Sequence, residues 1–112
     1  SPRTAVSPVM SDSVMTFGSL SLDTETRELI APSGSVHLTR TEAAILKKLM
    51  QNAERPVSKS ALLEDISQDT PDCTESSLKI HVSNLRKKMK GAELRESLES
   101  VWGIGFRLHL GT

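Results

Sequence analysis

The segment Ser77–Lys90, which reads SLKIHVSNLRKKMK, constrains the fold more than any other part of this chain. At about 100° per residue its apolar side chains fall in one narrow stripe, which indicates an amphipathic helix packed on one side. We therefore expect a helix over about residues 75–90 that is held against the core of a folded domain. The predicted stripe consists of Leu78, Val82, Leu85 and Met89.

The opposite face of this helix is polar and basic, and it is predicted to be exposed. Small hydroxyl and amide side chains let a helix approach base edges, and lysine suits phosphates and guanines. The residues on this face are Ser76, Lys79, Ile80, Ser83, Asn84 and Lys87, with His81 and Arg86 at the edges of the stripe.

Two features of this face have alternative explanations. Ile80 is apolar among polar neighbours, so it either meets a thymine methyl group or packs against a neighbouring loop or hairpin. Lys87, Lys88 and Lys90 either contact DNA or form a solvated helix end, where cations also interact favourably with the helix dipole.

The segments before this helix predict a sheet followed by two shorter helices. MTFGSLSLD, TRELIA and SVHL are short strand-like pieces separated by turn-prone residues, which indicates a small antiparallel sheet over roughly residues 14–38. Thr39 and Glu42 have capping-box spacing ahead of an apolar-periodic run that extends to about Ala53. Ser58 is placed to cap a second helix, SALLEDI.

The chain closes with a predicted hairpin. SLESVW and FRLHL flank the turn Gly103-Ile104-Gly105, whose glycines suit a tight turn. Three helices followed by a hairpin indicate a winged helix, in which the third helix enters a DNA groove and the hairpin is the wing.

Length and composition fit one domain and exclude a fold held together by internal disulfides. The chain has 112 residues, a formal net charge of zero and a single cysteine, Cys73, so it forms no internal disulfide. Acidic residues between Glu64 and Glu75 balance the basic helix that follows them. Residues 1–13 are rich in Ser and Pro and are expected to be a linker or disordered lead-in, so the domain is predicted over residues 14–112.

Catalytic and metal chemistry find no support in the sequence. The histidines are scattered without metal-ligand spacing, and Cys73 lies among acids that would raise its thiol pKa. Gly103-x-Gly105 lacks the G-K-[ST] context of a phosphate loop. We expect no enzyme activity, no cofactor and no metal site.

Several motifs in order carry a resemblance to a known family. SVHLTRTEAAILKKLMQNAERPVSKSALL, SSLKIHVSNLRKKM and LESVWGIGFRL match, across about residues 17–110, the C-terminal effector domain of OmpR/PhoB-type response regulators. The resemblance implies an α+β fold: an N-terminal four-stranded antiparallel sheet, a three-helix core and a C-terminal β-hairpin wing. It also implies transcription regulation within two-component systems in the cytoplasm.

The resemblance further implies partners. These are double-stranded DNA, expected to carry direct repeats, and RNA polymerase. The chain is expected to be a monomer when isolated and to form a tandem dimer on DNA. No membrane partner is expected for these residues. The third helix, about residues 75–90, would read the major groove, and the wing, about residues 98–110, would touch the minor groove. The alternative is a winged helix used for protein–protein contact, which the zero net charge keeps open.

Together, the resemblance and the residue types assign roles to individual side chains. Base contacts are expected from Lys79, Ile80, Ser83, Asn84 and Lys87. Phosphate contacts are expected from Ser76, Ser77, His81, Arg86, Lys88, Trp102 and Arg107. A loop that would touch RNA polymerase contributes Gln68, Asp69 and Asp72.

Four positions depart from the family pattern. Ser83 and Asn84 stand where many members have basic residues, so we do not expect bidentate guanine contacts there. We expect instead a set of base contacts that favours A·T pairs. Trp102 stands where family wings often carry Arg; its indole N–H would reach a phosphate, or its ring would pack. Arg107 is then the alternative source of wing charge, and Phe106 replaces the usual Tyr.

Overall fold

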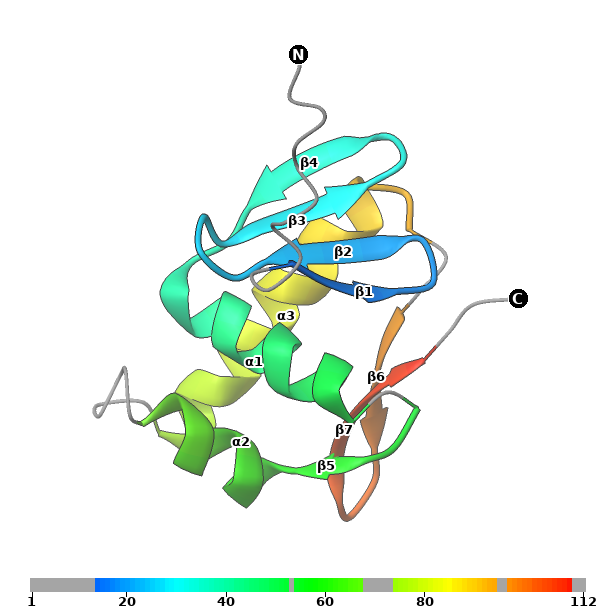
Figure 1. Cartoon of the computed structure of the whole chain (residues 1–112). Helices are drawn as coiled ribbons and strands as arrows, with labels where there is room; N and C mark the ends of the chain where they lie inside the picture. The colour runs from blue at the N-terminus through cyan, green and yellow to red at the C-terminus, as the bar shows by residue number, and fades with distance from the viewer. Residues whose placement is uncertain (1–13, 53, 68–73, 95–96, 110–112) are drawn as a thin grey trace.

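The computed structural model describes residues 14–52, 54–67, 74–94 and 97–109, and Figure 1 shows how their elements are arranged. The predicted lead-in, residues 1–13, lies outside these ranges. The strands are β1 (Val14–Phe17), β2 (Leu20–Asp23), β3 (Glu28–Ala31), β4 (Gly34–His37), β5 (Val57–Ser58), β6 (Ser97–Val101) and β7 (Gly105–His109). The helices within the described residues are α1 (Arg40–Gln51), α2 (Lys59–Ile66) and α3 (Glu75–Gly91).

The N-terminal sheet consists of β1 to β4, paired antiparallel in chain order, which confirms the predicted sheet. Its register places Leu22 opposite Leu29 and Leu29 opposite Val36. Leu20, Leu22 and Leu29 are fully buried, because alternate side chains of a strand point to one face and that face meets the core.

Side-chain caps begin α1 and α2 at the residues that the sequence indicates. The predicted capping box is confirmed: the Glu42 N–H donates to the Thr39 hydroxyl at 3.2 Å, and the Thr39 N–H donates to the Glu42 carboxylate at 3.0 Å. The Ser58 hydroxyl accepts from the Ala61 N–H, which begins α2. These caps satisfy backbone donors that have no partner within the helix.

The wing is part of a second sheet with strand order β5-β7-β6. The predicted hairpin is confirmed as β6 and β7, but β5 was not predicted, because two residues carry no periodic signal. In this sheet Ser58 pairs with Gly105. A Cβ on Gly105 would lie 2.9 Å from the Ser58 Cα and closer still to the Val57 carbonyl oxygen. Gly105 therefore permits close strand approach, whereas Gly103, with φ +80°, makes the turn.

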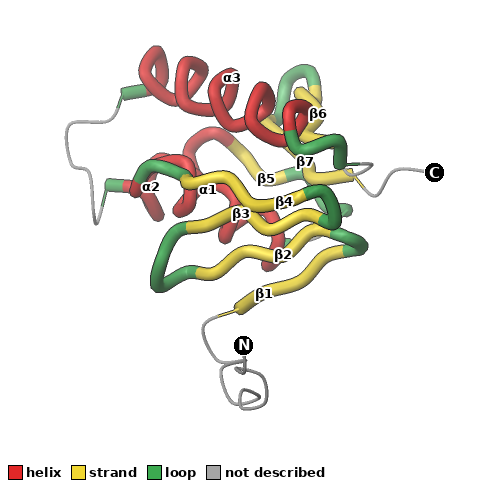
Figure 2. The backbone as a smooth tube through the Cα atoms, turned by 90° about the horizontal axis from the view of Figure 1, so that it is seen from above, coloured by secondary structure: helices red, strands yellow, loops and turns green. Residues whose placement is uncertain are grey.

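One apolar core joins both sheets and the helices within the described residues. Helix α1 contacts α2, α3 and the N-terminal sheet, and in Figure 2 α3 lies along one side of the molecule with that sheet on the other. The predicted stripe of α3 enters this core: Leu78 and Leu85 are fully buried, and Val82 and Met89 are 2% exposed. Among the described residues, no helix has the length and apolarity needed to cross a membrane. The fold is a winged helix, as predicted.

Candidate nucleic-acid interface

The outer face of α3 is exposed, as its sequence predicts. Burial of the apolar stripe fixes the rotation of the helix, so every third or fourth residue on the other side meets solvent. Ile80 is 62% exposed, so most of its side chain faces solvent. We call the exposed residues on this side of α3 the reading face; they are Ser76, Lys79, Ile80, Ser83, Asn84 and Lys87.

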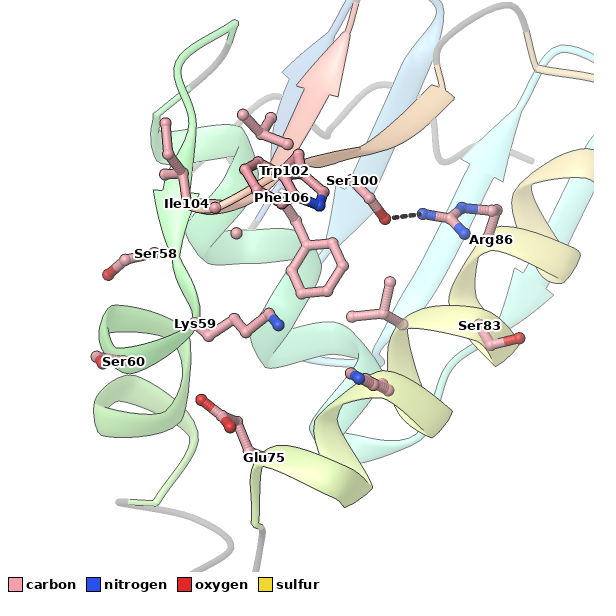
Figure 3. Close-up of a pocket in the computed structure, with 15 residues that line it drawn as sticks. Ser58, Lys59, Ser60, Glu75, Ser83, Arg86, Ser100, Trp102, Ile104 and Phe106 are labelled. Atoms are coloured by element: carbon pink, nitrogen blue, oxygen red, sulfur yellow. Dashed lines mark hydrogen bonds between the residues drawn. The ribbon is translucent and has the colours of Figure 1, made fainter.

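A groove of about 600 Å³ separates α3 from the wing (Figure 3). Lys79, Ser83 and Arg86 line it from α3, and Ser100 to Phe106 line it from the wing. Phe106 is 5% exposed and its ring points into the space between helix and wing. The groove therefore has an apolar floor and a wall formed by the helix that carries the reading face.

The start of α2 also lines this groove, which the sequence did not predict. Ser58, Lys59 and Ser60 contribute to the wall because β5 pairs with β7 and so brings the first turn of α2 beside the wing. Among the described residues that line the groove, Lys59 adds a cation to Lys79 and Arg86, and the carboxylate is that of Glu75. The Ser58 cap was recognisable from sequence, but the β5–β7 pairing that places it here was not.

Arg86 ties α3 to the wing. Its Nε donates to the Leu98 carbonyl at 3.0 Å, and its Nη2 donates to the Ser100 hydroxyl at 3.2 Å; Figure 3 shows the second bond. Its predicted partner was phosphate. Part of its donor set instead fixes the angle between helix and wing, and the exposed remainder of the guanidinium still faces the groove.

Lys88 lies apart from the reading face. Its Nζ is 2.6 Å from the carboxylate of Glu42, which is 2% exposed, and 3.2 Å from the His37 carbonyl oxygen. Lys88, for which the sequence predicts a phosphate contact, forms an ion pair between α3 and α1, and its side chain is 30% exposed. Because Glu42 partly neutralises its charge, we give Lys88 no part in the proposed interface.

Arg107 is also paired. It faces Glu99 across the β6–β7 ladder, with its Nη2 2.5 Å from the Glu99 carboxylate. The hydrogen bond from Arg107 holds the pKa of that carboxyl below its ordinary value. Arg107 therefore adds little net positive charge to the wing, although the sequence suggested it as the source.

The remaining predicted phosphate contacts lie near the start of α3 and at the wing tip. Ser77 takes part in the helix cap: its N–H donates to the Thr74 hydroxyl, which in turn donates to its side chain. His81 is half-buried beside the core stripe. Trp102 is 96% exposed, so its ring does not pack against the described part of the domain. The predicted polymerase-contact residues Gln68, Asp69 and Asp72 lie outside the described residues.

Comparisons with known proteins agree with this geometry. The family described as "Transcriptional regulatory protein, C terminal" matches residues 33–108. The response regulator MprA of Mycobacterium ulcerans (strain Agy99) is 36% identical over 98 residues, which cover 87% of this chain. The chain spans only 42% of the length of that relative.

Two solved structures are similar in both fold and sequence. The C-terminal domain of the nisin resistance regulator NsrR, a lantibiotic response regulator, is 29% identical with a TM-score of 0.76, over 87% of this chain and 98% of that one. The DNA-binding domain of the response regulator AdeR, solved in complex with an intercistronic region, is 25% identical with a TM-score of 0.74. That match covers 86% of this chain and 99% of the AdeR chain.

Proposed function

The chain belongs to the family of C-terminal domains of transcriptional regulatory proteins, and from this premise we propose how it binds double-stranded DNA. Helix α3 lies in the major groove and the wing touches the adjacent minor groove. The observation that carries this proposal is the polar and basic reading face of α3, exposed beside a groove with the cations Lys59, Lys79 and Arg86. The family is one of transcription regulators and not of enzymes.

The residues of the reading face divide into two roles. Ile80, Ser83 and Asn84 are short enough and exposed enough to meet base edges. Lys79 and Lys87 sit beside them, where an ammonium reaches either a phosphate or a guanine. The edges of the interface are completed by Arg86, Ser76, Ser77 and His81. This division supports direct readout by three side chains, flanked by charges that position the helix.

The wider assembly is part of the same proposal. The relatives are response regulators, which supports a role in controlled transcription for a longer protein of which residues 14–112 form the DNA-binding domain. We propose tandem binding at direct repeats by a chain that is monomeric when isolated, and action in the cytoplasm. Contact with RNA polymerase through the acidic segment at residues 67–73 remains a prediction, which the family resemblance supports.

A salt titration on duplex DNA tests the proposed function. Fluorescence anisotropy with a labelled duplex is expected to show nonspecific binding in the micromolar range at low salt, weakening steeply as salt rises. A domain that used this face only for protein contact would show no binding under those conditions, and that result would reject the proposal.

Two neighbouring lysines are expected to behave differently in that titration. Lys87→Gln should weaken all sequences alike and lower the salt slope by about one, because one phosphate contact releases about one counterion. Lys88→Gln should leave the slope unchanged and instead lower the free energy of unfolding by about 1 kcal/mol, because Glu42 loses its cation. Urea unfolding provides the stability measurement, and equal slopes for Lys87→Gln and wild type would contradict the assignment.

Ile80 and Asn84 are expected to determine sequence preference. Ile80→Ala and Asn84→Ala should each change discrimination at one base pair by about 1–3 kcal/mol and leave the salt slope intact. Deoxyuridine lacks the methyl group of thymine, so replacing the thymine that Ile80 contacts should weaken wild type and leave Ile80→Ala unaffected. Selection from random DNA supplies the site; if both variants select the wild-type site with wild-type stringency, the direct-readout assignment is wrong.

A further inference from the structure

We propose that Trp102 is an uncharged aromatic wedge through which the wing contacts the sugars and base edges of the DNA minor groove. This inference rests on the proposed DNA binding and identifies the side chain and the kind of contact at the wing tip. It replaces the phosphate contact that the sequence suggested for this residue.

The first observation is the exposure of the ring. Trp102 is 96% exposed at the hairpin tip, and Ile104, two residues later, is 50% exposed. Both flank Gly103, whose φ of +80° makes the tight turn, and the Ile104 N–H donates to the Val101 carbonyl to close it. The turn therefore presents an aromatic and an aliphatic side chain to water, and a partner that covered them would gain from their burial.

The second observation is the absence of available charge at the tip. Residues 101–105 contain no ionisable side chain. Arg107, the nearest cation on β7, is paired with Glu99, and Arg86 binds the Leu98 carbonyl and the Ser100 hydroxyl. Residues 101–105 themselves therefore carry no cation to place in a minor groove. The exposed Trp102 ring is the largest surface that the tip offers for this contact.

The third observation identifies DNA as the partner of this surface. The tip does not stand alone: it forms one wall of the groove whose other walls carry Lys59, Lys79 and Arg86. An apolar protein partner gains nothing from three cations at the edge of its contact, whereas a phosphate backbone in this groove pairs with them. When a DNA strand lies between α3 and the wing, the wing tip meets the adjacent minor groove.

The chemistry of the minor groove suits an aromatic wedge. Apolar side chains contact this groove in other DNA-binding proteins and open flexible base steps. Guanine carries an N2 amino group on the groove floor, and A·T pairs carry none. We therefore expect Trp102 to favour A·T pairs, and equally inosine·cytosine pairs, which lack that amino group but present the major-groove pattern of G·C.

Tryptophan emission tests the contact directly. The chain has one Trp and no Tyr, so its emission reports Trp102 alone. Titration of the full chain with an A·T-rich or an inosine·cytosine duplex should quench and blue-shift the emission, at concentrations where anisotropy of the labelled duplex shows binding. A G·C duplex of equal length should give a smaller change.

Three substitutions separate an apolar contact from a polar or purely structural one. Trp102→Ala should weaken binding to the A·T-rich duplex about tenfold and leave the salt slope unchanged. Trp102→Phe keeps an aromatic ring without the indole N–H and should retain most of the affinity. Trp102→Arg should steepen the salt slope by about one, because it adds a cation at the tip. Full exposure makes all three variants compatible with folding, which circular dichroism checks.

Each outcome decides the proposal. Quenching of the emission, together with a DNA affinity that falls in the order wild type, Trp102→Phe, Trp102→Ala, supports the wedge. Loss of affinity in Trp102→Phe equal to that in Trp102→Ala shows a hydrogen bond through the indole N–H and overturns it. DNA binding with unchanged emission and unchanged affinity in Trp102→Ala overturns the wedge but leaves the proposed function intact, and assigns the tip to a protein partner. No binding to any duplex overturns both.

Discussion

Replacing Gly105 with alanine is expected to lower the free energy of unfolding by about 3 kcal/mol and to weaken DNA binding through the wing. The added Cβ would overlap the Val57 carbonyl oxygen and lie 2.9 Å from the Ser58 Cα and 3.0 Å from the Lys59 N. These are backbone atoms, so no side chain can move aside. Relief requires β5 to separate from β7, which shifts both the wing and the start of α2.

Gly91 supplies the matched control for this substitution. It lies at the end of α3 and a Cβ there would meet nothing within 4 Å. Gly91→Ala is therefore expected to be neutral or to stabilise the domain by about 0.5 kcal/mol, because alanine is the better helix former. Urea unfolding followed by circular dichroism measures both variants. Equal stability of Gly105→Ala and Gly91→Ala would show that the close β5–β7 approach is not required.

Leu85→Ala is expected to have an effect of similar size by another mechanism. Leu85 is fully buried in the core and belongs to the stripe that holds α3 in place. Its truncation removes apolar burial and leaves a cavity, which costs about 3 kcal/mol in well-packed cores. A domain of this size has a total stability of about 5–15 kcal/mol, so the variant should unfold at clearly lower urea concentration.

The adjacent residue provides the contrast. Asn84→Ala alters an exposed side chain one position earlier in the same helix, so the unfolding midpoint should stay near that of wild type. Its effect should appear only in base preference, whereas Leu85→Ala should lose affinity for all sequences in proportion to the unfolded fraction. Trp102 emission is a poor probe of this unfolding because the ring is already 96% exposed. A midpoint shift for Asn84→Ala as large as that for Leu85→Ala would contradict the assigned faces.

Local signals made much of the fold and of the reading face predictable. The Thr39–Glu42 capping box and the Ser58 cap involve residues within one helical turn, so their spacing in sequence is sufficient to find them. The rotation of α3 follows from the spacing of Leu78 and Leu85, because helical periodicity fixes which side chains share a face. The exposure of Ile80 and Asn84 follows from the same periodicity.

Nonlocal pairings were not predictable in this way. The sequence suggested Gly105 as a turn glycine, and the structure places it against β5, which lies more than 40 residues earlier in the chain. Lys88 and Arg107 were indistinguishable from free cations in the sequence. Their partners Glu42 and Glu99 become evident only when α1 meets α3 and β6 meets β7. Lys59 entered the groove for the same reason.

The sequence by itself determined the winged-helix fold, the starts of the helices and the side of α3 that meets the core, because periodicity and capping act within a few residues. Only the tertiary structure decided which charges face the groove between α3 and the wing. An ion pair such as Lys88–Glu42 joins residues 46 apart and depends on how the helices pack. The tertiary structure also showed the bonds on which the proposal for the wing tip rests. Arg86 of α3 binds Leu98 and Ser100 of the wing, Arg107 pairs with Glu99, and Trp102 is exposed at the tip.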